Sequence, residues 1–104
     1  MIYALATPLE LAAEIGKNLR LARAAQGLRQ EDLAERSKAS LQAIKNLESG
    51  GKVELLTFLR VAGALGMTTG ILESCEPVPQ SLDEIERIEA ARAESTRVRV
   101  RPSQ

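Results

Sequence analysis

The side chains that could do chemistry in this chain are limited in kind. The 104-residue sequence has no histidine and one cysteine, Cys75. These counts exclude His-based acid–base and triad catalysis and leave no common set of zinc ligands. The acidic residues lie at spacings typical of solvated helix faces, so we expect no enzyme, no metal site and no cofactor. A lone cysteine cannot form an intramolecular disulfide, which fits a reducing, cytoplasmic location and a small, partly buried side chain.

The segment from Gly27 to Gly50 favours a binding function over catalysis. Two short helical patterns, residues 30–37 and 41–49, follow each other with only residues 38–40 between them. Helices joined by about 3–4 residues must cross steeply. The second helix of such a pair can protrude and enter the major groove of DNA. This segment is therefore the main indication of function.

Flanking helices must hold this pair in place. Pro8 after a capping Thr7 predicts a first helix that runs to about Gln26, and Gly27 is expected to end it. Ser40 is a suitable N-cap for the third helix, and Gly50–Gly51 ends it. The apolar residues expected to share one face of the first helix are Leu11, Ile15, Leu19 and Ala22. The core is expected to include Leu28, Leu33, Ala34, Ile44 and Leu47.

Two further helices complete an all-α domain. Residues 53–65 form a fourth apolar pattern that Gly66 stops, and Thr68 or Thr69 can cap a short fifth helix. Five helices in about 65 residues make a compact bundle. With only Tyr3 and Phe58 as aromatics, aliphatic residues must fill the core. No apolar run approaches the roughly 18 residues of a membrane span, and a signal peptide is not expected.

Pro77 and Pro79 mark a boundary after this helical bundle. We expect an N-terminal arm at residues 1–8, a helical domain at 9–76 and a C-terminal extension at 77–104. Ser81 and Glu84 have the capping-box spacing, which predicts a helix over about residues 81–94 with Ile85 and Ile88 on a narrow apolar face. Within residues 96–102, arginine and valine alternate, which suits an edge strand or a basic tail. Of these two we favour the tail.

Charge is unevenly distributed although the chain is formally neutral. Residues 10–52 hold eight basic and six acidic side chains, whereas residues 53–94 hold three basic and eight acidic ones. The last ten residues add three arginines. A modest local positive excess can still contact phosphates, and binding of this kind is sensitive to salt.

The order of several motifs closely resembles one known family. L-x-Q-x-x-L-A at residues 28–34 is followed by I-x-x-L-E-x-G at residues 44–50 and by A-G-A-L-G at residues 62–66. In this order the chain resembles the Cro/C1-type (XRE), lambda-repressor-like helix-turn-helix proteins over about residues 11–72. The resemblance implies a five-helix lambda-repressor-like DNA-binding domain, here with a short N-terminal arm and a C-terminal helix and basic tail.

The resemblance also implies roles for individual residues. Gln30 would bind a DNA phosphate, with Arg29 adding charge beside it, and such contacts set the register of the protein on DNA. Gln42 and Asn46 can each read an adenine edge, and Lys45 can reach a guanine or a phosphate. An ion pair between Arg23 and Glu48 would brace the first helix against the third. The remaining expected DNA contacts are Ser40 and Leu41 at the start of the recognition helix, Ala43 on its groove-facing side, and Ser49 and Lys52 after it.

One position departs from the family pattern. Family members often have glycine at the turn because the backbone there adopts positive φ, whereas this chain has Lys38. A lysine in that conformation costs on the order of 1 kcal/mol. Either the turn is slightly altered here or the fold tolerates this strain.

The resemblance further implies a two-fold homodimer on an inverted-repeat operator. Candidate dimer elements are residues 2–5, the fifth helix and the segment after residue 79. The length, the arm and the arginine-rich end are similar to antitoxins that repress their own operon and bind a HipA-type kinase toxin. The alternatives are a stand-alone bacterial or phage regulator and, less favoured, a protein-interaction adaptor without DNA binding.

Overall fold

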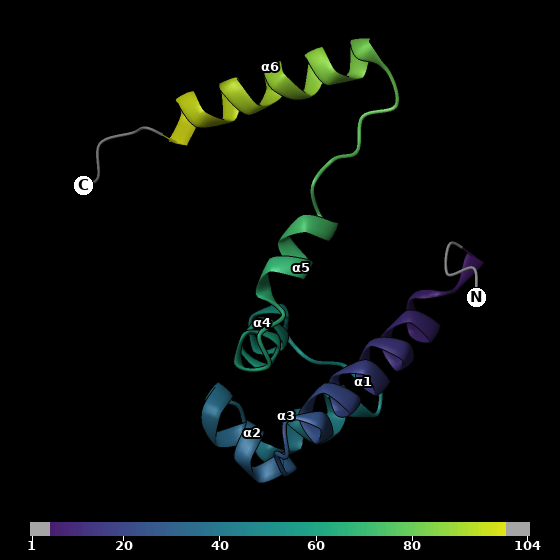
Figure 1. Cartoon of the computed structure of the whole chain (residues 1–104), viewed down its shortest axis with the longest axis vertical. Coiled ribbons are helices and arrows are strands. Elements are labelled where there is room, and N and C mark those ends of the chain that lie inside the picture. Colours follow the sequence, from purple (N-terminus) through teal and green to yellow (C-terminus); the bar gives the residue numbers. More distant parts are fainter. Residues whose placement is uncertain (1–4, 100–104) are drawn as a thin grey trace. The chain divides into compact units, whose positions relative to one another are not determined.

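The computed structural model describes residues 5–99, with side chains up to residue 96. This part of the chain is helical and contains no strand. It forms two compact units, which meet in the sequence between Leu72 and Glu73. The described helices are α1 (Pro8–Ala25), α2 (Gln30–Ser37), α3 (Leu41–Glu48), α4 (Leu55–Ala64), α5 (Thr68–Ser74) and α6 (Leu82–Arg99). The all-α fold expected from the sequence is confirmed, and its helices are shown in Figure 1.

Capping residues set where the first helices begin. The hydroxyl of Thr7 accepts the backbone N–H of Glu10 at 3.1 Å, and the Glu10 carboxylate accepts the backbone N–H of Thr7 at 2.8 Å. Ser40 caps α3 in the same way, because its hydroxyl accepts the backbone N–H of Ala43 at 3.0 Å. These two predicted N-caps are confirmed, and so is Ser81 before α6, whose hydroxyl accepts the backbone N–H of Glu84 at 3.1 Å. The expected cap of the fifth helix at Thr68 or Thr69 is wrong, because α5 begins at Thr68.

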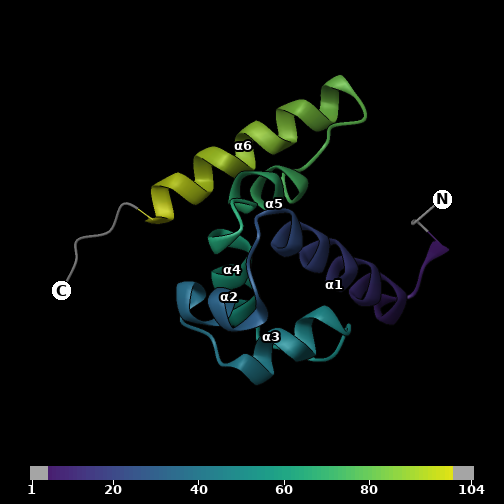
Figure 2. The same cartoon turned by 60° about the horizontal axis from the view of Figure 1, so that its bottom comes forward.

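The core of the first unit lies where α1, α2 and α4 surround α3. Figure 2 shows α2 and α3 as the crossing pair, with α1 and α4 beside them. Leu33 and Ile44 are fully buried, and the expected burial of Leu28 and Leu47 is confirmed. Ala34 is only partly buried against this core. The other buried aliphatic residues are Leu19, Val61, Ala62 and Leu65.

The apolar face predicted for α1 is buried only in its later turns. Leu19 is 3% exposed, whereas Leu11 and Ile15 are 36% and 43% exposed. The apolar residues at the start of α4 are more exposed still: Leu55 and Leu56 are 69% and 65% exposed. These residues lie in the first turns of their helices, whereas the buried residues of α1 and α4 lie in later turns.

A glycine lets α1 approach α3 closely. A Cβ built on Gly16 would lie 2.8 Å from the carbonyl oxygen of Glu48, and closer still to that of Leu47. Both oxygens belong to the backbone of the last turn of α3. No side chain fits between these backbones, so Gly16 fixes the separation of the two helices.

Lys38 has φ 58° and ψ 33°, so the turn between α2 and α3 is left-handed, and of the two alternatives the fold tolerates the strain. Among the described residues other than glycine, Lys38 alone has positive φ.

We expect Lys38→Gly to stabilise the protein by about 1 kcal/mol, because glycine adopts this conformation without the steric penalty of a Cβ. Thermal melts of the full chain measure the change. Lys38→Ala is the matched control, since it removes the charge and keeps the Cβ. A glycine variant no more stable than the alanine variant would show that the turn carries no such penalty.

The second unit differs from its expected form at two places. Helix α6 continues to Arg99, beyond the expected end near residue 94, so residues 96–99 are helical where a strand or basic tail was expected. The sequence from Leu82 to Val100 has no glycine or proline to stop the helix, and the Thr96 hydroxyl donates to the Arg92 carbonyl at 3.0 Å. Cys75 is exposed, so the prediction that it is partly buried is wrong. The expected arm contacts of residues 2–4 and the tail beyond residue 99 lie outside the described residues.

Candidate nucleic-acid interface

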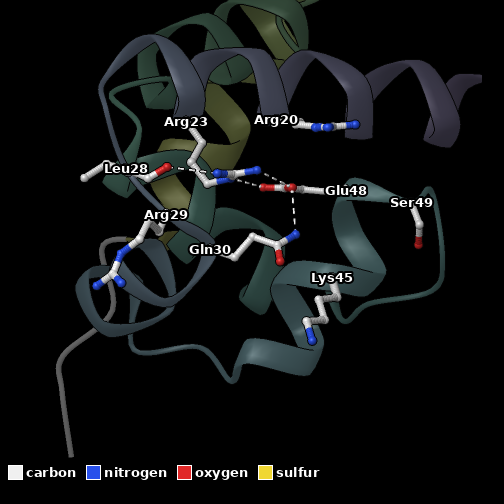
Figure 3. A pocket seen from close by; sticks show the side chains of 8 residues that line it. All are labelled: Arg20, Arg23, Leu28, Arg29, Gln30, Lys45, Glu48 and Ser49. Carbon is white, nitrogen blue, oxygen red and sulfur yellow. Dashed lines mark hydrogen bonds and ion pairs between the residues drawn. The ribbon is translucent and has the colours of Figure 1, made fainter.

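A hydrogen-bonded network joins the three helices around the candidate interface. Arg23 on α1 binds Glu48 on α3 through two bonds, Nε to Oε2 at 2.6 Å and Nη2 to Oε1 at 3.0 Å. Its third nitrogen, Nη1, donates to the carbonyl oxygen of Leu28 at 2.8 Å. Gln30, the first residue of α2, donates from Nε2 to Oε1 of Glu48 at 3.1 Å. Figure 3 shows the bonds from Arg23 and Gln30 converging on the Glu48 carboxylate.

The ion pair at the centre of this network is largely shielded from water. The side chains of Arg23 and Glu48 are 13% and 6% exposed. Burial raises the pKa of Glu48, but hydrogen bonds from Arg23 and Gln30 and the charges of Arg23 and Arg20 outweigh it, so the net pKa is lowered. The hydrogen bond to Glu48 is the main reason that the pKa of Arg23 is raised. Both groups are therefore charged at neutral pH.

The expected phosphate anchors at the start of α2 are both engaged with carboxylates. Gln30 is half-buried, and one of its two amide protons is directed to Glu48. Arg29 is exposed and forms a pair with Asp32, with Nε 3.3 Å from Oδ2. Asp32 also accepts the backbone N–H of Arg29 at 2.8 Å, which helps to begin the helix. The charge of Arg29 is thus balanced locally, and Gln30 keeps one amide proton for another acceptor.

The outer side of α3 presents a row of polar side chains. Gln42 and Lys45 are exposed, and Asn46 is half-buried beside them. Gln42 donates from Nε2 to Oδ1 of Asn46 at 3.0 Å, so the two amides form one hydrogen-bonded pair. This bond leaves the Oε1 and one amide proton of Gln42 and both amide protons of Asn46 for other partners.

The other candidate contacts flank this row. Ser40 is exposed at the start of α3, whereas Leu41 and Ala43 are half-buried. At the far end, Ser49 donates its hydroxyl to the carbonyl oxygen of Asn46 at 3.0 Å, and Lys52 is exposed in the following loop. The residues at 40, 42, 45, 46 and 49 therefore share one short helix and its ends, while residues 29, 30 and 52 come from neighbouring segments.

A polar hollow of about 590 Å³ lies beside this row. The residues that line it are Arg20, Arg23, Leu28, Arg29, Gln30, Lys45, Glu48 and Ser49. Sequence reasoning did not select Arg20, which belongs to no part of the helix-turn-helix motif. The available signal was its position one turn before Arg23 on α1, which places both side chains toward α3.

Other kinds of site find no support in the described residues. No group of three or more His, Cys, Asp or Glu side chains in this part of the chain is arranged to hold a metal ion. Among these same residues, no helix is both long and apolar enough to span a membrane.

Comparison with known proteins agrees with this geometry. The helix-turn-helix family model matches residues 19–72, which include the crossing helices α2 and α3 and most of their supports. A search of curated proteins gave no match. The matched segment covers more than half of the chain, and its two short helices meet at a left-handed turn with a polar outer face on the second. The chain therefore belongs to the Cro/C1-type (XRE) helix-turn-helix family of DNA-binding transcription regulators.

Proposed function

We propose that this protein is a sequence-specific transcriptional repressor that reads double-stranded DNA with α3. The observation that carries the proposal is the polar row on the outer side of α3, in which Gln42, Lys45 and Asn46 lie side by side. The Arg23–Glu48 network holds this helix against α1 and α2 from behind. A recognition helix needs such support because base contacts require fixed side-chain positions.

We assign base reading to the amide pair of Gln42 and Asn46. A side-chain amide offers a donor and an acceptor that match the N7 and N6 atoms of adenine in the major groove. Because these two amides are already bonded to each other, they act as one reader rather than two independent ones. The small side chain of Ala43 lets α3 approach the groove, and Leu41 is positioned at the same end to touch a thymine methyl group.

The remaining residues bind the DNA backbone in this proposal. Gln30 uses its second amide proton for a phosphate, and Arg29 adds positive charge beside it. Ser40 binds a phosphate from the start of α3, and Lys52 does so after its end. Ser49 does so by turning its hydroxyl proton from the Asn46 carbonyl oxygen to the phosphate. These contacts set register and carry no sequence information.

We further propose that the protein acts as a homodimer on an inverted repeat. The positive excess around one recognition helix is small, because most arginines near it are paired with carboxylates. Two linked copies would double the number of phosphate contacts and place two recognition helices on half-sites about 34–36 Å apart.

An antitoxin role is the more specific form of this proposal, in which the protein represses its own operon and binds a HipA-type kinase toxin. The second unit supports a protein partner, because Leu82 and Ile85 at the start of α6 are 78% and 42% exposed. Co-purification with a kinase encoded next to the gene, followed by loss of kinase activity in the complex, tests this role. A kinase that neither binds nor loses activity would leave the stand-alone regulator.

We expect Gln42→Ala to weaken binding to the protein's own upstream DNA by about 5–150-fold, because a good amide–adenine contact is worth about 1–3 kcal/mol. Asn46→Ala should give a similar loss, and the double variant should lose less than the sum because the amides act as one pair. Footprinting locates the operator, and titration of a labelled duplex gives the affinities. Gln80→Ala is the matched control, since Gln80 is an exposed glutamine of the second unit.

Two outcomes would contradict the proposal. Unchanged affinity in Gln42→Ala and Asn46→Ala would remove base reading from this face of α3. A wild-type protein that binds no DNA at moderate salt, yet forms a complex with another protein, would favour the adaptor function instead.

A further inference from the structure

We propose that Arg20 and Lys45 form a phosphate-binding cradle between α1 and α3, which brings α1 into contact with the DNA backbone. This inference rests on the proposed function and adds a residue outside the helix-turn-helix motif. The cradle is the hollow of about 590 Å³ that these two cations share with Gln30 and Ser49.

The charges around the hollow do not cancel. Glu48 supplies the single carboxylate in its lining and is bound by Arg23. Arg29 is paired outside the hollow with Asp32. Arg20 and Lys45 therefore remain as two positive charges that no lining carboxylate pairs with in a salt bridge. A site with two positive charges in excess favours an anion.

The two cations come from helices whose separation is fixed. Gly16 packs against the carbonyl oxygens of Leu47 and Glu48, so α1 and α3 cannot slide apart without losing their closest contact. Arg20 follows Gly16 by four residues, and Lys45 precedes Glu48 by three. Each cation is thus about one turn from this contact. Figure 3 shows Arg20 and Lys45 on opposite sides of the Arg23–Glu48–Gln30 network.

The lining of the hollow matches a phosphodiester. Arg20 offers a planar set of N–H donors and Lys45 a compact charge, and both are common phosphate ligands. Gln30 has one amide proton that is not bonded to Glu48. In this inference Gln30 donates that proton to the phosphate that Arg20 and Lys45 bind. The position beside the reading row of α3 fits a phosphate of the strand that borders the groove.

The slope of log affinity against log salt tests the cradle in the full chain. Each phosphate contact contributes about 0.9 to the magnitude of this slope on duplex DNA. We expect Arg20→Ala to reduce the magnitude by about 0.9, equally on the operator and on a scrambled duplex. Arg20→Lys should restore most of the slope because it keeps the charge.

Lys17→Ala is the matched control for charge. Lys17 lies one turn earlier on α1, is 69% exposed and pairs with Glu14 at 3.6 Å, outside the cradle. It should leave the slope nearly unchanged. Thermal melts of each variant separate loss of DNA contact from loss of folding, and Arg20→Ala must retain the wild-type helical content for the comparison.

The outcomes separate this inference from the proposed function. If wild-type protein binds its operator and Arg20→Ala has the same slope as Lys17→Ala, the cradle is wrong while DNA binding stands. If wild-type protein binds no DNA, both fail together. If Arg20→Ala weakens binding of inorganic phosphate to the free protein but leaves the salt slope on DNA unchanged, the hollow takes a free phosphate, which overturns its assignment to the DNA backbone.

Discussion

We expect Gly16→Ala to destabilise the protein by about 3 kcal/mol or more, at the upper end of the usual cost of overpacking. The added methyl group would lie 2.8 Å from the carbonyl oxygen of Glu48 and even closer to that of Leu47. Both atoms belong to the backbone of α3, so no side-chain rotation relieves the clash. Relief requires α1 and α3 to separate, which also stretches the Arg23–Glu48 pair.

The sign of this effect is informative because helix propensity predicts the opposite. Alanine in a helix interior is favoured over glycine by about 1 kcal/mol. Gly63 provides the matched control, since a Cβ there would meet Thr68 at 3.5 Å, an ordinary contact. We expect Gly63→Ala in α4 to be neutral or stabilising.

Urea unfolding of the full chain, followed by circular dichroism, measures the free energy of unfolding of both variants. A loss of about 3 kcal/mol corresponds to a fall of roughly 12–24 °C in melting temperature for a domain of this size. A Gly16→Ala protein as stable as wild type would mean that α1 and α3 do not meet at this glycine.

The features set by neighbouring residues in the chain were predictable from the sequence. Thr7, Ser40 and Ser81 cap their helices through residues three positions away. Such signals depend on short stretches of chain, so the pattern alone contains them.

The features set by the crossing of helices were not predictable in the same way. The contact of Gly16 with α3 depends on the distance between two helices, and nothing in the residues around position 16 encodes it. The same crossing brings Arg20 and Lys45 to the lining of one hollow, on opposite sides of Glu48 (Figure 3). The exposure of Leu55 and Leu56 also follows from packing, because an apolar pattern identifies a helix face without showing whether another element covers it.

The resemblance to a family supplied part of what spacing could not. It paired Arg23 with Glu48 across 25 positions of sequence, and the structure contains this pair. It did not indicate that Gln30 shares the same carboxylate, nor that Gln42 is bonded to Asn46. Those bonds depend on side-chain positions specific to this chain.

We expect Glu48→Ala to destabilise the protein by roughly 3–5 kcal/mol, because breaking one side of a shielded ion pair leaves the other charge without compensation. The Arg23 guanidinium is 13% exposed and would lose two of its three hydrogen-bonded nitrogens. Gln30 would lose its acceptor as well. Glu14→Ala is the matched control, since Glu14 pairs with the exposed Lys17 and contributes about 0–1 kcal/mol at most.

The same pair makes stability depend on pH in a defined direction. The pKa of Glu48 is lowered in the folded protein from the ordinary glutamate value of 4.5. Its contribution is therefore fully present above that unfolded value and is lost as the pH falls through the lower folded value. We expect wild-type stability to decrease as the pH falls below about 4.5, the glutamate value of the unfolded chain. In Glu48→Gln the decrease should be smaller, because the amide does not titrate.

Urea unfolding at a series of pH values, from neutral down through this window, measures the difference between the two proteins. Glu10 and Asp32 also have lowered pKa values through their own hydrogen bonds, so some acid destabilisation should remain in Glu48→Gln. A double-mutant cycle with Arg23→Ala isolates the pair from these background groups. Identical pH dependence in wild type and Glu48→Gln, together with no coupling in the cycle, would show that the bidentate pair does not brace α1 against α3 in solution.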